Sequence, residues 1–363
     1  MSIEVEETER SSEVRPRCFS VDDAITEGNI KNDNVISHWI GPWTRNSYAN
    51  FPLVKQDTQN LRNFFKYNDG ETCIIVSSGP SLDGQIKDIL AADRSKFKIV
   101  STTSALNPLI ANGIMPDYAT INDGAPWVAD LHYTFLYEQL KEIPLIISTT
   151  CHPSTARKWP GPLLWYNDYS PEVPLMSNDG GLFLTYYSLT GIPVGGCTTN
   201  LSIRIAVLLG FKNIIMAGMD LSFQGRTAHC TKYKRDDFGK WVPRESNSSF
   251  YTEKARWIFR GCPDGCSFVL NEWQTDMPIH PQWDEWEKCP DCGKKFRHVV
   301  TSAEYLFYMR DLSSLVNGIQ GGSITVDFGN GPENRTLKIS TLSDNSITCV
   351  LRLPEKTLKE ALE

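Results

Sequence analysis

The sequence predicts an α/β protein built on a Rossmann-like, doubly wound and mostly parallel sheet, and three observations support this prediction. Short apolar runs without polar alternation recur along the chain, as in strands that are buried on both faces of a parallel sheet. Segments with helical periodicity separate these runs, and short loops join them. Small-residue turns follow several of the runs, where the helices of such folds begin.

The elements of the predicted core follow one another from residue 72 onward. The first strand, residues 72–77, contains four consecutive apolar residues and ends in the turn Ser78-Gly79-Pro80-Ser81. Its lack of alternation favours burial on both faces. Similar patterns predict further strands at residues 98–102, 118–121, 145–148 and 213–218 and helices at residues 82–92, 105–111, 131–141, 198–209 and 301–316.

Composition divides the rest of the chain into four further parts. Residues 1–16 are predicted to be a disordered acidic tail, and residues 17–66 a partly helical lead-in segment that packs on the core. The Rossmann-like core covers residues 67–254 and 299–318 and is interrupted by a cysteine-rich insert at residues 255–298. Residues 319–363 alternate apolar and polar positions between turn signals, which predicts a small antiparallel β hairpin or meander module.

Charge and hydropathy exclude several classes of protein. The 36 Lys and Arg residues against 43 Asp and Glu residues give a net charge of −7, which argues against general coating of nucleic acid. No apolar run is long enough to span a membrane, and the N-terminal residues lack the apolar core of a signal peptide. We therefore expect a cytoplasmic protein whose ten cysteines are thiols or metal ligands. A homo-oligomer is compatible with the sequence.

The insert carries the clearest ligand pattern of the chain. Two cysteine pairs with Cys-x3-Cys and Cys-x2-Cys spacing are separated by 22 residues, and this arrangement is typical of one tetrahedral Zn²⁺ ion. Four thiolates form a closed, structural site rather than a catalytic one. The predicted ligands are Cys262, Cys266, Cys289 and Cys292, with His280 or His298 as a replacement for one thiol.

Nucleic acid would contact the protein only through this insert. The residues that favour such contact are the basic Lys294, Lys295 and Arg297, whereas acidic neighbours weigh against it: Asp284, Glu285 and Glu287. Stabilisation of the insert is the simpler role for zinc.

The turn after the first strand is the first candidate binding site. A glycine-containing turn between strand and helix can direct backbone N–H groups at a phosphate, and Ser77, Ser78 and Ser81 add hydroxyl donors around Gly79 and Pro80. The alternative is an ordinary tight turn in which Ser81 caps the following helix. The string matches neither the P-loop nor the G-x-G-x-x-G pattern, so neither P-loop kinase nor dehydrogenase chemistry is indicated.

Three polar residues follow other strands at the same predicted edge. A carboxylate at Asp123 is placed to hold Mg²⁺ on nucleotide phosphates or to bind a ribose hydroxyl, and the alternative is an Asx-type turn with Gly124. Asp220 ends the last buried strand, and His229 follows it with a possible acid–base role. For a single histidine on a loop, simple exposure to solvent is the alternative.

A second helix start carries small residues. Gly195 and Gly196 precede Thr198 at the beginning of a predicted helix, which indicates a second anion or sugar site. The alternative is close packing of this helix on the sheet, which also requires small residues.

Four motifs in one order resemble the MptE-like 6-hydroxymethylpterin diphosphokinase family, whose domain also occurs in the motility accessory factors that glycosylate flagellin. The motifs are Ile75–Asp83, Leu109–Asp117 with Asp123, Gly195–Ile215, and Gly218–Phe223 with His229. The resemblance covers roughly residues 70–235 and 300–315. The sequence departs from the family pattern at Ser78, where glycine or alanine is frequent, and in the cysteine-bearing insert.

The resemblance implies a Rossmann-like fold, similar to that of bacterial sialyltransferases that use a CMP-sugar. The archaeal members transfer pyrophosphate from ATP to a pterin alcohol with Mg²⁺. By position, Gly79, Pro80 and Ser81 would hold the nucleotide phosphates. Asp123 and Asp220 would lie beside the metal or the acceptor, and His229 at the rim of the site.

These observations predict a nucleotide-dependent transferase that binds a nucleotide donor and a small-molecule acceptor. Pyrophosphoryl transfer from ATP to a hydroxymethyl group is the first version, with Mg²⁺ on the donor. Glycosyl transfer from a nucleotide sugar is the alternative. A second alternative, from another class, is a non-catalytic binding or assembly module.

Overall fold

The computed structural model describes most of the predicted core. The described residues are 21–56, 60–169, 189–223, 228–244, 257–261, 268–272, 292–295, 297–320, 324–327, 332–342 and 355–363. The predicted acidic tail at residues 1–16 lies outside them.

A nine-stranded sheet forms the centre of the described part of the chain, and all its paired strands are parallel. Its order is β16-β15-β7-β1-β2-β3-β4-β5-β6. The strands are β1 (Thr72–Val76), β2 (Lys98–Thr102), β3 (Tyr118–Ile121), β4 (Leu145–Ser148), β5 (Leu163–Tyr169), β6 (Gly191–Pro193), β7 (Asn213–Ala217), β15 (Lys338–Leu342) and β16 (Glu355–Lys356).

The sheet grows from β1 in two directions. Strands β1 to β6 are added in order on one side, and the chain then returns through helix α7 (Thr198–Leu208) to place β7 on the other side of β1. This reversal is the doubly wound arrangement, so the predicted fold class is confirmed. The four apolar residues of β1 are all buried, in agreement with a strand covered on both faces.

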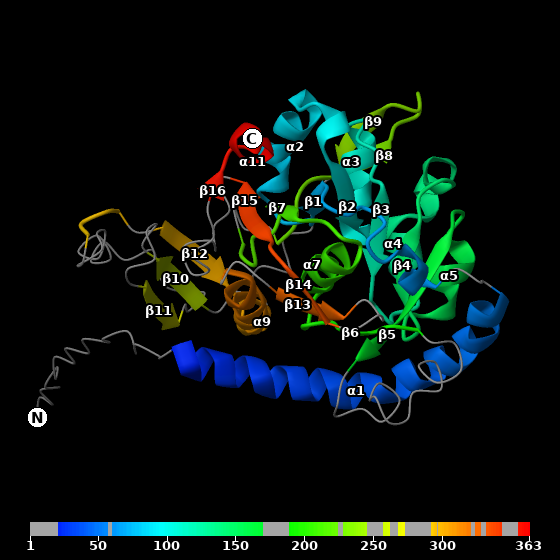
Figure 1. Cartoon of the computed structure of the whole chain (residues 1–363), viewed down its shortest axis with the longest axis horizontal. Coiled ribbons are helices and arrows are strands. Elements are labelled where there is room, and N and C mark those ends of the chain that lie inside the picture. Colours follow the sequence, from blue (N-terminus) through cyan, green and yellow to red (C-terminus); the bar gives the residue numbers. More distant parts are fainter. Residues whose placement is uncertain are drawn as a thin grey trace, which may run out of the picture.

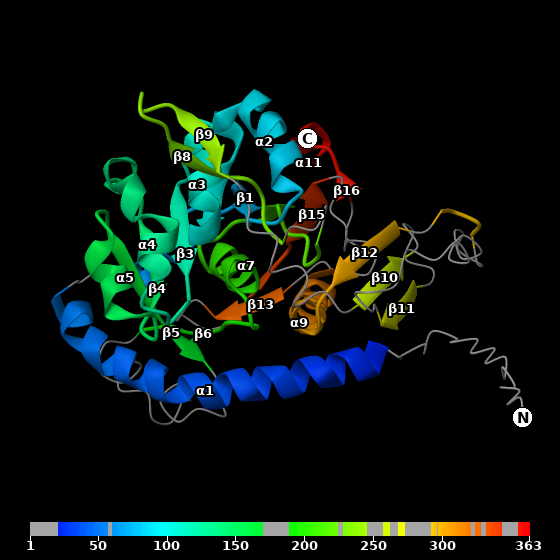
Figure 2. The same ribbon diagram turned by 180° about the vertical axis from the view of Figure 1, so that it is seen from behind.

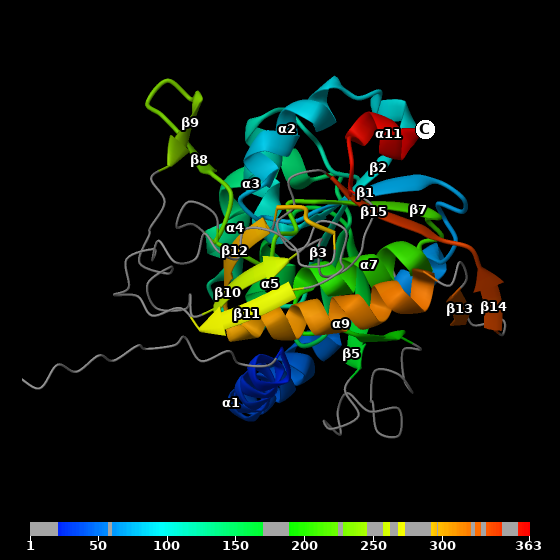
Figure 3. The ribbon, with the colours of Figure 1, turned by 90° about the vertical axis from the view of Figure 1, so that its left-hand side faces the viewer.

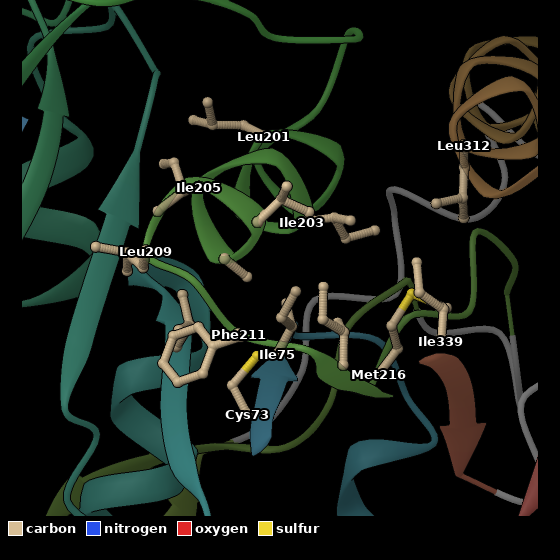
Figure 4. Close-up of a cluster of buried hydrophobic side chains, with 14 of the residues drawn as sticks. Cys73, Ile75, Leu201, Ile203, Ile205, Leu209, Phe211, Met216, Leu312 and Ile339 are labelled. Atoms are coloured by element: carbon tan, nitrogen blue, oxygen red, sulfur yellow. The ribbon is translucent and has the colours of Figure 1, made fainter. Parts of the chain in front are cut away.

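Helices cover both faces of the sheet (Figures 1 and 3). On one face, Ile75 and Met216 pack with Leu201 of α7 and Leu312 of α9 (Figure 4). Helix α9 (Ala303–Gln320) lies between α7 and α1 (Figure 3). On the other face, the alternate residues of the strands pack against three helices: α2 (Leu82–Ala91), α3 (Leu106–Ala111) and α11 (Leu358–Leu362).

The lead-in segment is a long helix, α1 (Val21–Gln56), that runs along one side of the molecule (Figure 1). It contains Pro42 and Pro52, which lack the N–H that a helix interior uses. Tertiary contacts fix its C-terminal half: the Asn46 amide donates to the carbonyls of Gly124 and Thr150, at 3.1 and 2.9 Å. The predicted packing of this segment on the core is therefore observed.

The region between β3 and α7 contains elements that the sequence did not predict. The expected helix at residues 131–141 is instead a short helix α4 (Val128–His132) followed by the 3-10 segment η4 (Thr134–Leu140). Helix α5 (Pro153–Lys158) and strand β6 were not predicted because they are short, and β5 was not predicted because polar residues interrupt its apolar run. Outside this region, the 3-10 segment η3 (Thr103–Ala105), between β2 and α3, was not predicted either.

Three small antiparallel sheets stand beside the core. They are the hairpin β8–β9 (Lys232–Arg235 and Trp241–Arg244), the sheet β11-β10-β12 (Phe268–Glu272, Trp257–Gly261 and Arg297–Thr301) and the hairpin β13–β14 (Ile324–Asp327 and Pro332–Arg335). Figure 2 shows β8–β9 next to α3. Among the helices of the described ranges, none is long and apolar enough to cross a membrane.

The C-terminal module differs in part from its prediction. The hairpin β13–β14 is antiparallel as expected. Strand β15, which was expected in the same module, pairs in parallel with β7 and extends the main sheet. The last four residues of β15 are buried on both faces of the sheet. The alternation of apolar and polar residues around Leu337 and Ile339 therefore did not indicate a strand with one exposed face. The predicted third strand at residues 347–351 lies outside the described residues.

Candidate functional site

The candidate site lies where the strand order reverses. In doubly wound sheets, ligands bind outside the carboxyl ends of the strands at such a point. In this chain the reversal occurs at β1, between β7 and β2. The loops after these three strands carry most of the residues that the sequence predicted as a site.

Residues 77–81 form the turn between β1 and α2, called the Gly79 turn below. The N–H of Gly79 donates to the carbonyl of Gly218 at 2.7 Å and so ties the end of β1 to the end of β7. A Cβ atom at residue 79 would overlap that carbonyl oxygen and lie 2.5 Å from Asp220 Oδ2. The close approach of the two loops therefore requires glycine at this position.

Asp220 holds the Gly79 turn from the other side. Its Oδ2 accepts from the backbone N–H of Ser81 at 2.7 Å, and its Oδ1 accepts from the Ser81 hydroxyl at 2.5 Å. The side chain is buried, and this burial raises the pKa of Asp220 to about 6, although both hydrogen bonds from Ser81 oppose the rise. These two hydrogen bonds show that Asp220 positions Ser81 in the Gly79 turn, and a catalytic role of Asp220 stays a prediction.

Most backbone N–H groups of the Gly79 turn are used within the protein and cannot form the predicted phosphate cradle. The N–H groups of Ser77, Gly79 and Ser81 donate to Ala217, Gly218 and Asp220 respectively, and Pro80 has no N–H, which leaves the Ser78 N–H of this turn for a ligand. The alternative is not formed either, because the Ser81 side chain makes no capping hydrogen bond to α2. A phosphate group would also have to bind other donors of this edge.

A line of hydroxyl groups connects His229 to the end of β2. His229 Nδ1 lies 3.2 Å from Ser78 Oγ, which lies 2.9 Å from Ser104 Oγ, which in turn lies 3.0 Å from Thr102 Oγ1. Thr102 Oγ1 donates to the carbonyl of Val76 at 3.4 Å. Four residues from three segments of the chain thus share one chain of hydrogen bonds.

This chain fixes which ring nitrogen of His229 carries a proton. Each hydroxyl has one proton, and Thr102 gives its proton to a carbonyl, which can only accept. Thr102 must then accept from Ser104, Ser104 from Ser78, and Ser78 from His229 Nδ1–H. In the neutral ring, Nε2 is left unprotonated and able to accept a proton.

The charge state of His229 agrees with a base. Desolvation and the nearby Lys232 ammonium lower the pKa of His229 to about 4, and a hydrogen bond to the Ser78 backbone opposes this shift. At neutral pH the ring is therefore neutral. The residue is exposed, and its place at the rim of the site stays a prediction.

Two basic residues near His229 were missed by sequence reasoning. Lys232 Nζ donates to the carbonyl of Ser104, and His132 Nδ1 lies 3.1 Å from Thr103 Oγ1. Lys232 is the first residue of β8, and His132 is the last residue of α4. Nothing in the local sequence places α4 and β8 beside the neighbouring residues Thr103 and Ser104 of η3, so only the proximity of Lys232 to His229 along the chain was available as a signal.

Asp123 stands apart from this cluster. Its Oδ1 accepts from the backbone N–H of Ala125 at 2.9 Å, which is the Asx-type turn considered as the alternative. The side chain is exposed, although desolvation raises its pKa. Helix α1 covers the adjoining turn, since a Cβ at Gly124 would lie 2.9 Å from the Trp43 ring.

The two predicted carboxylates do not form a shared Mg²⁺ site. Asp123 follows β3 and Asp220 follows β7, and three strand spacings of about 4.8 Å separate these strands by roughly 14 Å. Both oxygens of Asp220 are also occupied by Ser81. Within the described residues, no group of three or more metal-ligating side chains could hold an ion.

The small residues before α7 pack against α9. A Cβ at Gly195 would meet Asp311, and a Cβ at Gly196 would lie 2.6 Å from the Tyr308 ring. Both glycines have positive φ angles, 68° and 81°. Close packing therefore requires these glycines, although their partner is helix α9 and not the sheet that the alternative assumed. The Thr198 hydroxyl donates to Asn122 Oδ1 at 2.5 Å, which attaches the start of α7 to the end of β3.

A buried carboxyl group near the end of β5 was also missed. The Thr150 hydroxyl donates to Asp168, and burial raises the pKa of Asp168 to about 6. Its Oδ1 atom has no hydrogen-bond partner among the described residues. Asp168 lies in a strand that mixes apolar and polar residues, so the sequence did not indicate that its carboxyl group would be buried.

The zinc prediction falls mostly outside the described residues. Cys262, Cys266 and Cys289 belong to the part that is not described, whereas Cys292 is described and exposed. Gly293 has a φ of 71°, which agrees with the tight turn expected after the second cysteine pair.

This chain is similar to one known protein family and to a solved structure. The family model described as "6-hydroxymethylpterin diphosphokinase MptE-like" matches residues 45–226, which is half of the chain. Among solved structures, the chain is similar to the MAf glycosyltransferase from Magnetospirillum magneticum AMB-1, with 22% identity over 54% of this chain and a TM-score of 0.35. The match covers 33% of that longer chain. The curated proteins give no match.

Proposed function

Because the chain belongs to the MptE-like 6-hydroxymethylpterin diphosphokinase family, we propose that it is a transferase that moves a group from a nucleotide donor to an acceptor hydroxyl. The observation that carries this proposal is His229 at the strand reversal, with Nδ1 3.2 Å from the Ser78 hydroxyl. We infer that Nδ1 donates to this hydroxyl, which makes Nε2 the proton acceptor of the ring. A family domain alone would leave the reaction open, whereas a neutral histidine at the ligand-binding edge supplies the base that such a transfer requires.

We propose pyrophosphoryl transfer from ATP as the first version. The acceptor oxygen attacks the β-phosphorus, the bond between that phosphorus and the oxygen bridging to the α-phosphorus breaks, and AMP leaves. The acceptor proton passes to His229 Nε2. The Gly79 turn, held by Gly218 and Asp220, fixes Ser78 and through it the orientation of the ring.

Glycosyl transfer from a nucleotide sugar is the second version, and one observation favours it. Asp220 accepts two hydrogen bonds from Ser81, and its strand lies three positions from that of Asp123, so the two carboxylates are not placed to hold one donor metal together. A glycosyl transfer to a hydroxyl needs a base for the acceptor and does not depend on that pair. The Mg²⁺ requirement stays a prediction for the assay.

A thermal-shift panel tests the proposal. The purified protein is heated with ATP, GTP, CTP, CMP and common nucleotide sugars, each with and without Mg²⁺. A donor that binds the folded protein raises the unfolding temperature by mass action. We expect stabilisation by ATP with Mg²⁺ for the first version, or by CMP or a nucleotide sugar for the second. No shift with any nucleotide would contradict the proposal and favour the non-catalytic module.

We further propose that the insert binds one structural Zn²⁺ ion, and the register of its sheet supports this. Gly261 pairs with both Phe268 and Arg297, so these three residues lie at one end of the sheet. Cys262 follows Gly261 directly, and Cys292 precedes Arg297 by five residues. Metal analysis of freshly purified protein should give about one Zn²⁺ per chain. Folded protein without zinc would overturn this proposal.

A further inference from the structure

Three basic side chains from different parts of the chain converge on two residues. His132 lies against the Thr103 hydroxyl, Lys232 donates to the Ser104 carbonyl, and His229 reaches the Ser104 hydroxyl through Ser78. Thr103 and Ser104 begin η3 directly after β2. The three basic groups therefore gather at the carboxyl end of one strand, beside the strand reversal.

The backbone holds this arrangement firmly. The N–H of Cys230 donates to the Ser78 carbonyl at 2.8 Å, and Thr231 donates through both its N–H and its hydroxyl to Asp83. Asn107 of α3 then accepts from the Tyr233 N–H at 2.7 Å and donates to the Tyr233 carbonyl at 3.0 Å. Residues 230–233 are thus fixed across the ends of β1 and β2, and Lys232 is fixed with them.

The charged forms of these groups are disfavoured in the absence of a ligand. The pKa of His132 falls to about 4, first through desolvation and then through the charges of Lys232 and His229. The pKa of Lys232 is also lowered by desolvation, against the opposing effects of Cys230 and Asp83. Asp83 already binds Thr231, so its carboxylate is only partly available to balance Lys232. An anion beside these three groups would favour their protonated, charged forms and so raise their pKa values.

We propose that His132, Lys232 and His229 form a binding site for a tetrahedral phosphate-type dianion at the carboxyl end of β2. The inference rests on the proposed function and deepens it, because the ligand would be a phosphate group of the nucleotide donor. It also replaces the backbone cradle that the Gly79 turn does not offer. A bound dianion raises the pKa of both imidazoles, so binding takes up protons and strengthens as the pH falls. The pKa of His229 starts at about 4, so a rise of about one unit still leaves the ring mostly neutral at pH 7 and able to accept the acceptor proton.

Inorganic sulfate is a suitable probe, since it is a tetrahedral dianion that does not titrate between about pH 3.5 and 8, a range that includes the pKa of about 4 of both His132 and His229. The ring C–H signals of the six histidines are followed by NMR over this range, in sulfate and in chloride of equal ionic strength. The variants His132→Asn and His229→Asn assign the two signals. We expect sulfate to raise both pKa values by about one unit or more, as an opposite charge at contact distance does. The signals of His38 and His152 should not move.

Lys232→Met tests the third group, with Lys234→Met as the matched control on the same strand. Lys234 is exposed, and its removal changes the net charge equally. We expect Lys232→Met to weaken sulfate binding at least tenfold, and Lys234→Met to leave it unchanged. Unchanged His38 and His152 signals in each variant report an intact fold.

Each outcome separates this inference from the proposed function. Sulfate that leaves His132 and His229 unmoved, or that binds Lys232→Met as well as the unaltered chain, would overturn the dianion site. If nucleotides still stabilise the protein in that case, the proposed function stands with its phosphates bound elsewhere. If sulfate raises both pKa values but no nucleotide stabilises the protein, the dianion site stands and the proposed function fails.

Discussion

Replacement of His229 by Asn is expected to lower turnover of the donor by a factor of about 10²–10⁴, the usual contribution of a general base. The Asn amide can still donate to Ser78, as Nδ1–H does, but it has no counterpart of Nε2. The side chain is exposed, so the unfolding temperature should change little. Turnover is measured with the donor that the thermal-shift panel selects.

His152→Asn is the matched control, because this histidine caps α5 through Ser154 and lies outside the site. It should leave turnover unchanged. Ser104→Ala should also lower turnover, since the freed Ser78 proton allows the other ring tautomer of His229. Ser104→Thr keeps the hydroxyl and should restore both turnover and the ring ¹⁵N shifts. Normal turnover in His229→Asn would contradict the proposal that His229 is the general base.

The second large effect is expected from Gly79→Ala, which should abolish stabilisation by the donor and destabilise the fold by about 3 kcal/mol. The new methyl group would overlap the Gly218 carbonyl oxygen and crowd the Asp220 carboxylate. Backbone cannot yield as a flexible side chain does, so the Gly79 turn must move away from β7. Thermal and denaturant unfolding, with and without donor, measure both effects.

Gly84→Ala is the matched control, because Gly84 lies in α2 five residues away with open space around its Cβ position. It should stabilise the protein by about 0.5 kcal/mol through helix propensity. Gly79→Ala with the donor affinity of the unaltered chain would show that the turn has no part in binding.

Two variants of Asp220 examine the other half of this contact. In Asp220→Asn, the amide can accept from the Ser81 N–H and donate to its hydroxyl oxygen, so donor binding should persist. Asp220→Ala leaves the buried Ser81 N–H without its acceptor, so this variant should lose donor binding. Donor binding with lost turnover in Asp220→Asn would instead place the carboxylate in the chemistry.

Most of the core could be predicted because its signals are local. Strands such as β1 and β7 are short apolar runs, because a strand that is buried on both faces needs apolar residues at consecutive positions. Strand β5 escaped prediction because Asn167 and Asp168 interrupt its apolar pattern. Strand β15 was assigned to the wrong sheet, because local alternation does not say which strand will be its neighbour.

Local sequence patterns were enough to predict the fold class, the family, the Gly79 turn and the histidine after β7. The contacts that these residues make depend on the tertiary structure. Asp220 became the partner of Ser81, 139 residues away, and His132 and Lys232 joined His229 at the end of β2. The physical reason is that sheet order and helix placement bring distant loops to one edge, and hydrogen bonds between such loops leave no trace in local sequence patterns.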